Sequence, residues 1–428
     1  MTLVLPAFIL LFVLIICGIP VVVSLGLSAA IWVLVSGQSS DAISSSYYQS
    51  INSFVQLAIP FFVLSGEIMN RAGITGHLID FCQMLLGRIR GGLAYAVVLA
   101  SMLFAGITGA GVADVSALGT IFIPSMEKKG YNRVWSAALI AGTAVIGPTI
   151  PPSIITVIYG AVTGVSIGAL LIGCAIPGIL MGLLMMLYVG IISKKRDFPK
   201  DTTKYTVKEA VKISRNASLA LIMPLIIIGG ILSGLFTPTE AACVAVFYAF
   251  FVGVFVFKSL KLNDIYESFE TTVKISANML MLMAAGGILS WMLAKSGAPM
   301  VLSHWLLSTT QNTNLIFAFG IAVAFFLGCF MDNGVACILA APILAPIAKA
   351  AGIDPIHFGV AMIISLNIGL ITPPFGLNMF TAAVVGKVKY DDIVPEIWPY
   401  LIVTIFIVII IVFFPQMVLW LPGLAGLI

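Results

Sequence analysis

The sequence predicts an all-α protein that crosses a membrane several times and contains two homologous repeats. Of its 428 residues, 61% are hydrophobic and only 9% are charged, and the mean hydropathy is +1.15. Soluble domains carry about 25% charged residues, so this chain cannot cover its surface with water-facing side chains. Apolar segments of about 20 residues, the length of a membrane-spanning helix, recur along the chain. A Gly/Pro motif occurs twice, which indicates the repeats.

The repeats are identified by the sequences GPTIPPS, from Gly147, and GLITPPF, from Gly369, which lie 222 residues apart. Four further pairs keep this spacing: Gly106 with Gly328, Pro124 with Pro346, Gly130 with Gly352, and Gly164 with Gly386. Matching Gly/Pro interruptions of apolar segments in two halves are the best sequence pointer to the binding site of a membrane transporter. The pattern therefore predicts a duplicated transporter.

We expect six consecutive parts. They are N-terminal membrane helices (1–50), a first repeat (51–192), a linker (193–216), further membrane helices (217–270), a second repeat (271–392) and a C-terminal membrane helix (393–428). The first apolar segment has no basic region before it and no clear small-residue cleavage site. We therefore expect a retained membrane helix rather than a signal peptide.

Each repeat is expected to contain a re-entrant hairpin followed by a broken helix. Residues 94–126 and 313–349 are too long for one crossing, and their centres, GITGAG and GCFMDNG, are rich in glycine and polar residues. Such backbone is tolerated at membrane depth only where protein covers it or where it lines a wet cavity. The broken helices are expected at 132–164 and 355–386. We expect the two repeats to be inverted, which requires an odd number of crossings between them.

The linker 193–216 holds eight basic residues and three acidic residues, so the positive-inside rule places it in the cytoplasm. Four lysines follow one another at four-residue intervals: Lys200, Lys204, Lys208 and Lys212. This spacing predicts an amphipathic helix on the inner membrane surface. A solvated loop is the alternative.

The double prolines predict two cation sites, one in each repeat. The second proline of each pair lacks a backbone donor and stops the incoming helix. The carbonyls of residues 144–147 and 366–369 then lose their helical partners, and Na⁺ held by unwound carbonyls is the recurring solution. A plain proline kink would suit a single motif, but duplication after two Gly-rich hairpins favours ion sites. The predicted Na⁺ ligands, mostly backbone oxygens, are Gly106, Gly147, Ile150 and Ser153 in the first site and Gly328, Gly369, Thr372 and Phe375 in the second.

Four acidic residues lie within apolar segments, where charge is costly and usually functional. Asp332, at the second hairpin tip, is expected either to contact substrate or to cap the returning helix. Asp114, one turn past the first tip, is expected to be structural. Glu240, in the sequence TPTE, is expected to form a helix-capping box. Glu67 has no assigned role.

Composition also argues against several functions. A net charge of +4, dispersed along the chain, does not suggest nucleic-acid binding. Six single cysteines and three scattered histidines give neither a disulfide framework nor a metal site. No nucleophile–base pair stands out, so an enzyme is not expected. The hairpin tips hold no lysine or arginine, so an anionic substrate would be held by helix N-termini, hydroxyl groups and bound cations. An ion channel with hairpins as its filter is the alternative from a different class.

Over essentially its whole length the chain resembles the large membrane subunit of tripartite ATP-independent periplasmic (TRAP) transporters. The stretches that carry this resemblance are IPFFVLSGEIMNRAGI (59–74), GITGAGVADVSALG (106–119), GPTIPPS (147–153), GLFTPTEAA (234–242) and GLITPPFG (369–376). The first hairpin lacks the Ser-rich tip common in the family, so Thr108 becomes the better candidate for a hydroxyl contact. The second hairpin has Asp332–Asn333 where the family usually has Asp–Pro.

This resemblance implies an elevator-type secondary transporter of the ion-transporter superfamily, in which the helices outside the repeats form the scaffold. It implies two partner proteins, a small four-helix membrane subunit and a periplasmic substrate-binding protein. Membrane lipid is a further expected partner. We expect Na⁺-coupled uptake of an organic acid, N-acetylneuraminate (sialic acid) first, across the bacterial inner membrane, with at least two Na⁺ ions. The substrate is expected between the hairpin tips, near Thr108, Ser153 and Asp332. Alternatives are a large subunit for a C4-dicarboxylate or sugar acid, and a stand-alone Na⁺/dicarboxylate symporter.

Overall fold

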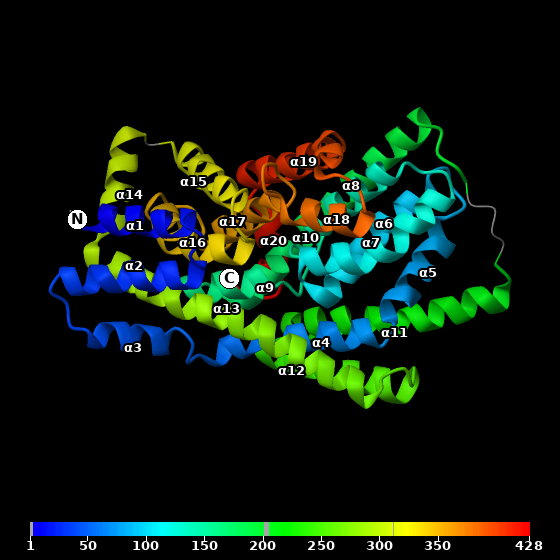
Figure 1. Cartoon of the computed structure of the whole chain (residues 1–428), viewed down its shortest axis with the longest axis horizontal. Helices are drawn as coiled ribbons and strands as arrows, with labels where there is room; N and C mark the ends of the chain where they lie inside the picture. Colours follow the sequence, from blue (N-terminus) through cyan, green and yellow to red (C-terminus); the bar gives the residue numbers. More distant parts are fainter. Residues whose placement is uncertain (1–2, 201–204, 311) are drawn as a thin grey trace.

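The computed structural model describes residues 3–200, 205–310 and 312–428, and these residues are almost entirely helical (Figure 1). Lys204, one of the four evenly spaced lysines, lies outside the described residues. The helices before residue 200 are α1 (Val4–Ile16), α2 (Val21–Val35), α3 (Asp41–Gln49), η1 (Phe54–Leu57), α4 (Ala58–Arg71), α5 (Ile74–Leu86), α6 (Gly92–Thr108), α7 (Gly111–Lys128), α8 (Arg133–Thr143), η2 (Ala144–Ile146), α9 (Ile154–Thr163) and α10 (Ile167–Lys195).

The second half of the chain has a similar order of elements. Its helices are α11 (Val207–Leu232), α12 (Pro238–Phe251), the π-helical turn η3 (Val252–Val256), α13 (Leu262–Ser296), α14 (Ala298–Thr309), α15 (Thr313–Gly328), α16 (Asn333–Ala350), α17 (Pro355–Gly369), α18 (Leu377–Gly386), α19 (Tyr390–Phe413) and α20 (Gln416–Leu424).

The helices confirm a polytopic membrane protein. Six helical segments of the described chain are long and apolar enough to cross a bilayer: α10, α11, α12 with η3, α13, α16 and α19. The pair formed by α3 and η1–α4 passes the same test together but is bent by 51°. Helix α13, with 35 residues, is the longest. It crosses the lower half of Figure 1 and packs against α2 and α4.

Both expected hairpins form as two helices joined at a short turn, and their re-entrant position in the membrane remains a prediction. Helices α6 and α7 meet through Gly109 and Ala110, and Gly109 has a positive φ of 61° that suits glycine. Helices α15 and α16 meet through residues 329–332. The helices of each hairpin contact each other.

Both helices that were expected to be broken are interrupted at their double prolines. Residues 147–153 separate η2 from α9, and residues 370–376 separate α17 from α18. Matching helices keep the spacing of the motifs closely. For example, α8 begins at Arg133 and α17 at Pro355, 222 residues later.

The packing of these elements is reciprocal. Helix α9, which follows the first break, packs against α16 of the second hairpin. Helix α18, which follows the second break, packs against α7 of the first hairpin. Each hairpin also packs against the helix that precedes its own break, α8 or α17. The two hairpins and two broken helices therefore interlock into one body. The common origin of the repeats and their inverted orientation remain predictions.

Two expected boundaries differ from the structure. The linker does not form a separate surface helix, because a capping box between Thr206 and Glu209 starts α11, which continues without a break to Leu232. Lys200 lies before that helix, in an isolated β-bridge with Arg90. At the C-terminus, one helix was expected over 393–428, but two are present. Helix α19 ends before Pro415, because proline disfavours helical backbone at the preceding residue, and α20 begins after it.

Candidate functional site

A small cavity lies between the two hairpin tips. Its volume is about 160 Å³. The first tip lines it through residues 109–112, the second through residues 332–334, and α9 through its first turns. Met279 of α13 and Leu370 complete the lining. The cavity is therefore built from both halves of the chain.

Three helices begin at this cavity. Gly111 starts α7, Ile154 starts α9 and Asn333 starts α16, and all three residues line the cavity. A helix N-terminus carries free N–H groups and roughly half a positive charge. No lysine or arginine is among the described lining residues. The helix ends are therefore the positive groups that face the cavity, and the Asp332 carboxylate is a negative one.

Of the three expected substrate residues, the structure places only Asp332 in the cavity lining. Its Oδ1 accepts a hydrogen bond from the Gly334 backbone N–H at 2.9 Å, so the side chain also caps α16. Ser153 is fully buried beside the first break, where its hydroxyl donates to the Pro148 carbonyl at 2.6 Å. It also caps α9 by accepting from the Thr156 N–H at 3.4 Å. Thr108 lies half-buried on α6, and its hydroxyl donates to the Asp114 carboxylate.

The first hairpin tip lies directly on the first break. A Cβ atom added to Gly109 would lie 2.5 Å from the Pro152 carbonyl oxygen, and one on Gly106 would lie 3.8 Å from that of Pro151. Gly147 lies at the end of η2, within reach of the Asp114 carboxylate. The Ile150 side chain instead packs toward α10, 2.5 Å from the position of a Cβ on Gly178. The structure thus places Gly106, Gly147 and Ser153 where the first hairpin tip meets the first break, and the Ile150 side chain points away from this place. We call this meeting point the first junction, and the matching one in the second half of the chain the second junction.

The second hairpin approaches the second break even more closely. A Cβ on Gly369 would lie 2.1 Å from the carbonyl carbon of Gly328, and one on Gly328 would lie 2.7 Å from the Leu366 carbonyl oxygen. Only glycine allows these two backbones to touch. The Thr372 hydroxyl, within the break, donates to the carbonyl of Ile368 in the last turn of α17 at 2.8 Å. Phe375 is 49% exposed, and its ring packs against that of Phe380.

Asp114 lies at the first junction, although it was expected to be only structural. The residue is fully buried. One carboxylate oxygen accepts from Thr108, and the other, Oδ2, has no hydrogen-bond partner among the described residues. A Cβ on Gly147 would lie 2.0 Å from this Oδ2. A buried carboxylate without a compensating partner is strongly unfavourable, so this position calls for a cation or a proton.

Asn378 lies at the same junction and was missed by the sequence reasoning. It is fully buried on α18, and both polar atoms of its amide lack a partner among the described residues. A Cβ on Gly111 would lie 3.0 Å from its Oδ1, and also 3.0 Å from the Ala144 carbonyl oxygen. The amide reaches the first tip only because α18 packs on α7. No local pattern around Asn378 signals this contact.

Asn367 joins the two breaks, and it was also missed. Its Nδ2 donates to the Pro148 carbonyl and to the Thr149 hydroxyl, each at 3.2 Å. Its Oδ1 accepts from Asn333 Nδ2, on the second hairpin, at 2.8 Å. Asn367 is fully buried. One side chain therefore ties the second hairpin tip and both interrupted helices together.

The remaining intramembrane acids have local roles. Glu240 forms the expected capping box with Thr237, which confirms that prediction. Glu67 lies 3.8 Å from Arg71 on the same face of α4. In the described part of the chain no group of three or more His, Cys, Asp and Glu side chains is placed to hold a metal ion. Cation binding at the junctions would therefore rely on backbone, hydroxyl, amide and single carboxylate oxygens.

Comparison with known proteins adds independent findings. The family model for the tripartite ATP-independent periplasmic transporter, DctM component, matches residues 8–417. The sialic acid TRAP transporter large permease protein SiaM of Vibrio cholerae is 36% identical over 95% of this chain and 95% of its own length. The C4-dicarboxylate TRAP transporter large permease protein DctM of Pseudomonas aeruginosa is 36% identical over 94% of this chain and 95% of its own length.

A solved structure shares the fold. The YdaH transporter of Alcanivorax borkumensis superposes with a TM-score of 0.63, and the match covers 87% of each chain at 14% sequence identity. At this identity the similarity shows the fold alone.

Proposed function

The chain belongs to the DctM family of tripartite ATP-independent periplasmic transporters and is a large permease subunit for solute uptake, and we propose that it carries an organic acid together with Na⁺. Its relatives are permease subunits, not enzymes. The observation that carries the proposal is the convergence of the N-termini of α7, α9 and α16 on one cavity. Oriented helix ends favour a carboxylate there without an arginine or lysine.

Na⁺ coupling is supported by the two junctions. At the first, the unpaired Oδ2 of Asp114 provides the negative charge that a cation needs. At the second, the Gly328 and Gly369 backbones meet where α17 ends. Gly109 lines the substrate cavity and also contacts the first break. A cation that orders this junction would therefore order the cavity wall, so cation and anion binding would strengthen each other.

We propose N-acetylneuraminate as the first substrate to test and a C4-dicarboxylate as the second. Relatives named for each are equally similar to this chain, at 36% identity. The cavity of about 160 Å³ favours the smaller acid, since pockets for larger ligands start at roughly 300 Å³. A nine-carbon acid would require the hairpin tips to separate.

The proposed mechanism is an elevator movement in the bacterial inner membrane. The interlocked hairpins and broken helices would move as the transport body, while α1, α2, α11 and α12 would form the scaffold. The family works with a small membrane subunit and a periplasmic binding component, and we propose both as partners. Membrane lipid would surround the exposed apolar helix faces.

Uptake by proteoliposomes tests this proposal. The purified chain would be reconstituted with its partner proteins, and uptake of labelled N-acetylneuraminate and of a labelled C4-dicarboxylate would be measured. We expect one acid to accumulate under an inward Na⁺ gradient. Uptake without a binding protein would instead favour a stand-alone symporter. Ion flux that ignores both acids would favour a channel.

A further inference from the structure

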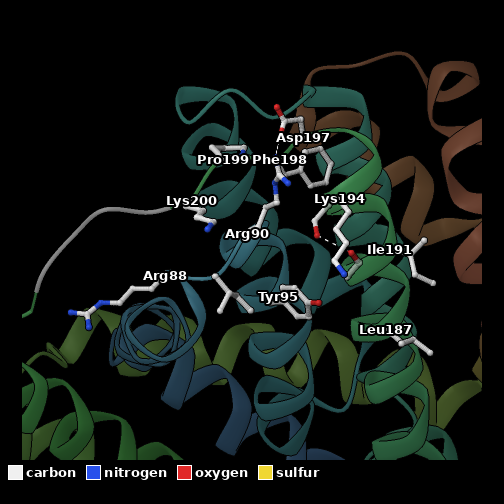
Figure 2. A pocket seen from close by; sticks show the side chains of 13 residues that line it. Arg88, Arg90, Tyr95, Leu187, Ile191, Lys194, Asp197, Phe198, Pro199 and Lys200 are labelled. Atoms are coloured by element: carbon white, nitrogen blue, oxygen red, sulfur yellow. Dashed lines mark hydrogen bonds and ion pairs between the residues drawn. The ribbon is translucent and has the colours of Figure 1, made fainter.

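A second, larger cavity opens on the side of the molecule where α10 ends. Its volume is about 1300 Å³. It lies between the turn that joins α5 to α6, the last turns of α10 and the segment that follows α10. Figure 2 shows Arg90 and Lys200 above Tyr95, with Arg88 on one side and Ile191 and Leu187 on the other. None of these residues takes part in the proposed transport site.

The cavity is strongly basic. Four cationic side chains line it, against one carboxylate, that of Asp197. Asp197 forms an ion pair with Arg90. The other three cations, Arg88, Lys194 and Lys200, have no carboxylate partner among the described residues. The cavity therefore has a surplus of positive charge that is free to bind an anion.

The basic residues are held in place by the backbone. The Gly91 N–H donates to the Pro199 carbonyl at 3.2 Å, and Arg90 and Lys200 form an isolated antiparallel bridge. Phe198 is buried, and its ring centroid lies 4.6 Å from that of Trp135. These contacts fasten the segment after α10 to the α5–α6 turn, so two of the four cations have fixed backbone positions.

The apolar part of the cavity points to an amphipathic ligand. Leu187, Ile191 and Lys194 follow one another on the same face of α10, at spacings of four and three residues. Leu187 is 62% exposed and Ile191 is 63% exposed, within a helix long enough to span the membrane. The face thus passes from hydrocarbon-facing side chains to a lysine at the membrane boundary. A free phosphate ion would use only the charged end of this surface.

We propose that this cavity binds an anionic phospholipid of the cytoplasmic leaflet. The phosphate would lie among Arg88, Lys194 and Lys200, and the acyl chains would lie along Leu187 and Ile191. Basic pockets on the cytoplasmic side of membrane helices attract such head groups, and the positive-inside rule places this side in the cytoplasm. Three unpaired cations favour a head group with two phosphates over one with a single phosphate. The proposal does not depend on the transported substrate.

Lipid binding to the purified full chain tests this proposal. Bound lipid would be counted by native mass spectrometry after addition of diphosphatidylglycerol, phosphatidylglycerol, phosphatidylethanolamine or inorganic phosphate. The test variant is Lys194→Gln with Lys200→Gln. The matched control is Lys208→Gln with Lys212→Gln, which removes the same charge from exposed positions on α11, away from the cavity.

We expect the wild-type chain to bind diphosphatidylglycerol best. The Lys194/Lys200 variant should bind it about tenfold more weakly, since each basic residue near the head group adds to the attraction. The Lys208/Lys212 control should bind as the wild type does. Three results would each overturn the proposal. The two double variants could bind diphosphatidylglycerol equally well. The wild-type chain could prefer phosphatidylethanolamine, or it could bind inorganic phosphate as tightly as lipid. Arg88→Gln should weaken binding in the same direction, which gives a second, single-residue check.

Discussion

Asn333 donates a hydrogen bond from its side chain to Oδ1 of Asn367, at 2.8 Å. Asn367 then donates to the Pro148 carbonyl and to the Thr149 hydroxyl. This chain of contacts runs from the second hairpin tip to the interrupted helix of the other half. Asn367 thus connects the two junctions through one buried side chain, so a movement of the backbone at one junction can displace the other.

Replacing this amide should impair the whole transport body. Asn367→Ala leaves the half-buried Asn333 amide without its partner. It also removes one of the two donors to the Pro148 carbonyl, which keeps the bond from Ser153. An unsatisfied buried polar group costs about 1–3 kcal/mol. We expect a lower thermal unfolding temperature and strongly reduced uptake. Asn333→Ala removes only one of the contacts and should have a smaller effect. Equal uptake by Asn367→Ala and the wild type would show that the bridge has no part in transport.

Asp114 should set the Na⁺ requirement. In Asp114→Asn the side chain keeps its shape and its contact with Thr108 but loses the negative charge at the first junction. Losing a charge-assisted contact of about 1.5–3 kcal/mol corresponds to at least a tenfold rise in the Na⁺ concentration for half-maximal uptake. Uptake would be measured against Na⁺ concentration at fixed ionic strength. An unchanged Na⁺ dependence would remove Asp114 from the cation site.

Two substitutions distinguish the two possible roles of Asp332, helix capping and substrate binding. Asp332→Ala loses both the helix cap and the carboxylate, so uptake should be abolished and stability should fall by about 1 kcal/mol. Asp332→Asn keeps a capping oxygen, so the unfolding temperature should stay near that of the wild type. We expect its KM for the organic acid to rise, because the carboxylate that accepts from substrate hydroxyl or amide groups is gone. A wild-type KM would mean that Asp332 acts only as a cap.

Close backbone contact at the second junction makes Gly369 intolerant of a side chain. The added Cβ of Gly369→Ala would lie 2.1 Å from the Gly328 backbone, so the hairpin tip must move. We expect folded protein with little or no uptake. The matched control is Gly76→Ala on α5, where a Cβ meets no atom within 4 Å. That variant should transport normally, and loss of uptake in both would point to a general effect of alanine.

Much of the fold follows from glycine and proline in the sequence. The two double prolines and the Gly-rich centres at 106–111 and 328–334 predicted the positions of both breaks and both tips, because these residues act on the local backbone. The capping box at Thr237 and Glu240 was predictable for the same reason. Two expected boundaries were wrong. At Pro415, apolar composition continues across the break between two helices. At the linker, a polar segment extends into the membrane helix α11.

The side chains that complete the candidate site were not predictable in this way. Asn367 and Asn378 are single amides in apolar helices, and their roles depend on which helix packs on which. Asn378 reaches the first hairpin only through the reciprocal packing of α18 on α7. Asp114 was visible as an intramembrane acid, but its unpaired oxygen became evident only beside Gly147. Contacts between the halves of the chain leave no periodic signal in either half.

We propose above all that Na⁺ binds where the hairpin tips meet the interrupted helices. Binding of radioactive sodium to the purified chain, in wild type and in Asp114→Asn, tests it most directly. We predict saturable binding of more than one ion per wild-type chain, no competition by K⁺, and the loss of one ion in the variant. Absence of saturable Na⁺ binding, or identical binding by the two proteins, would contradict a Na⁺ site at these junctions.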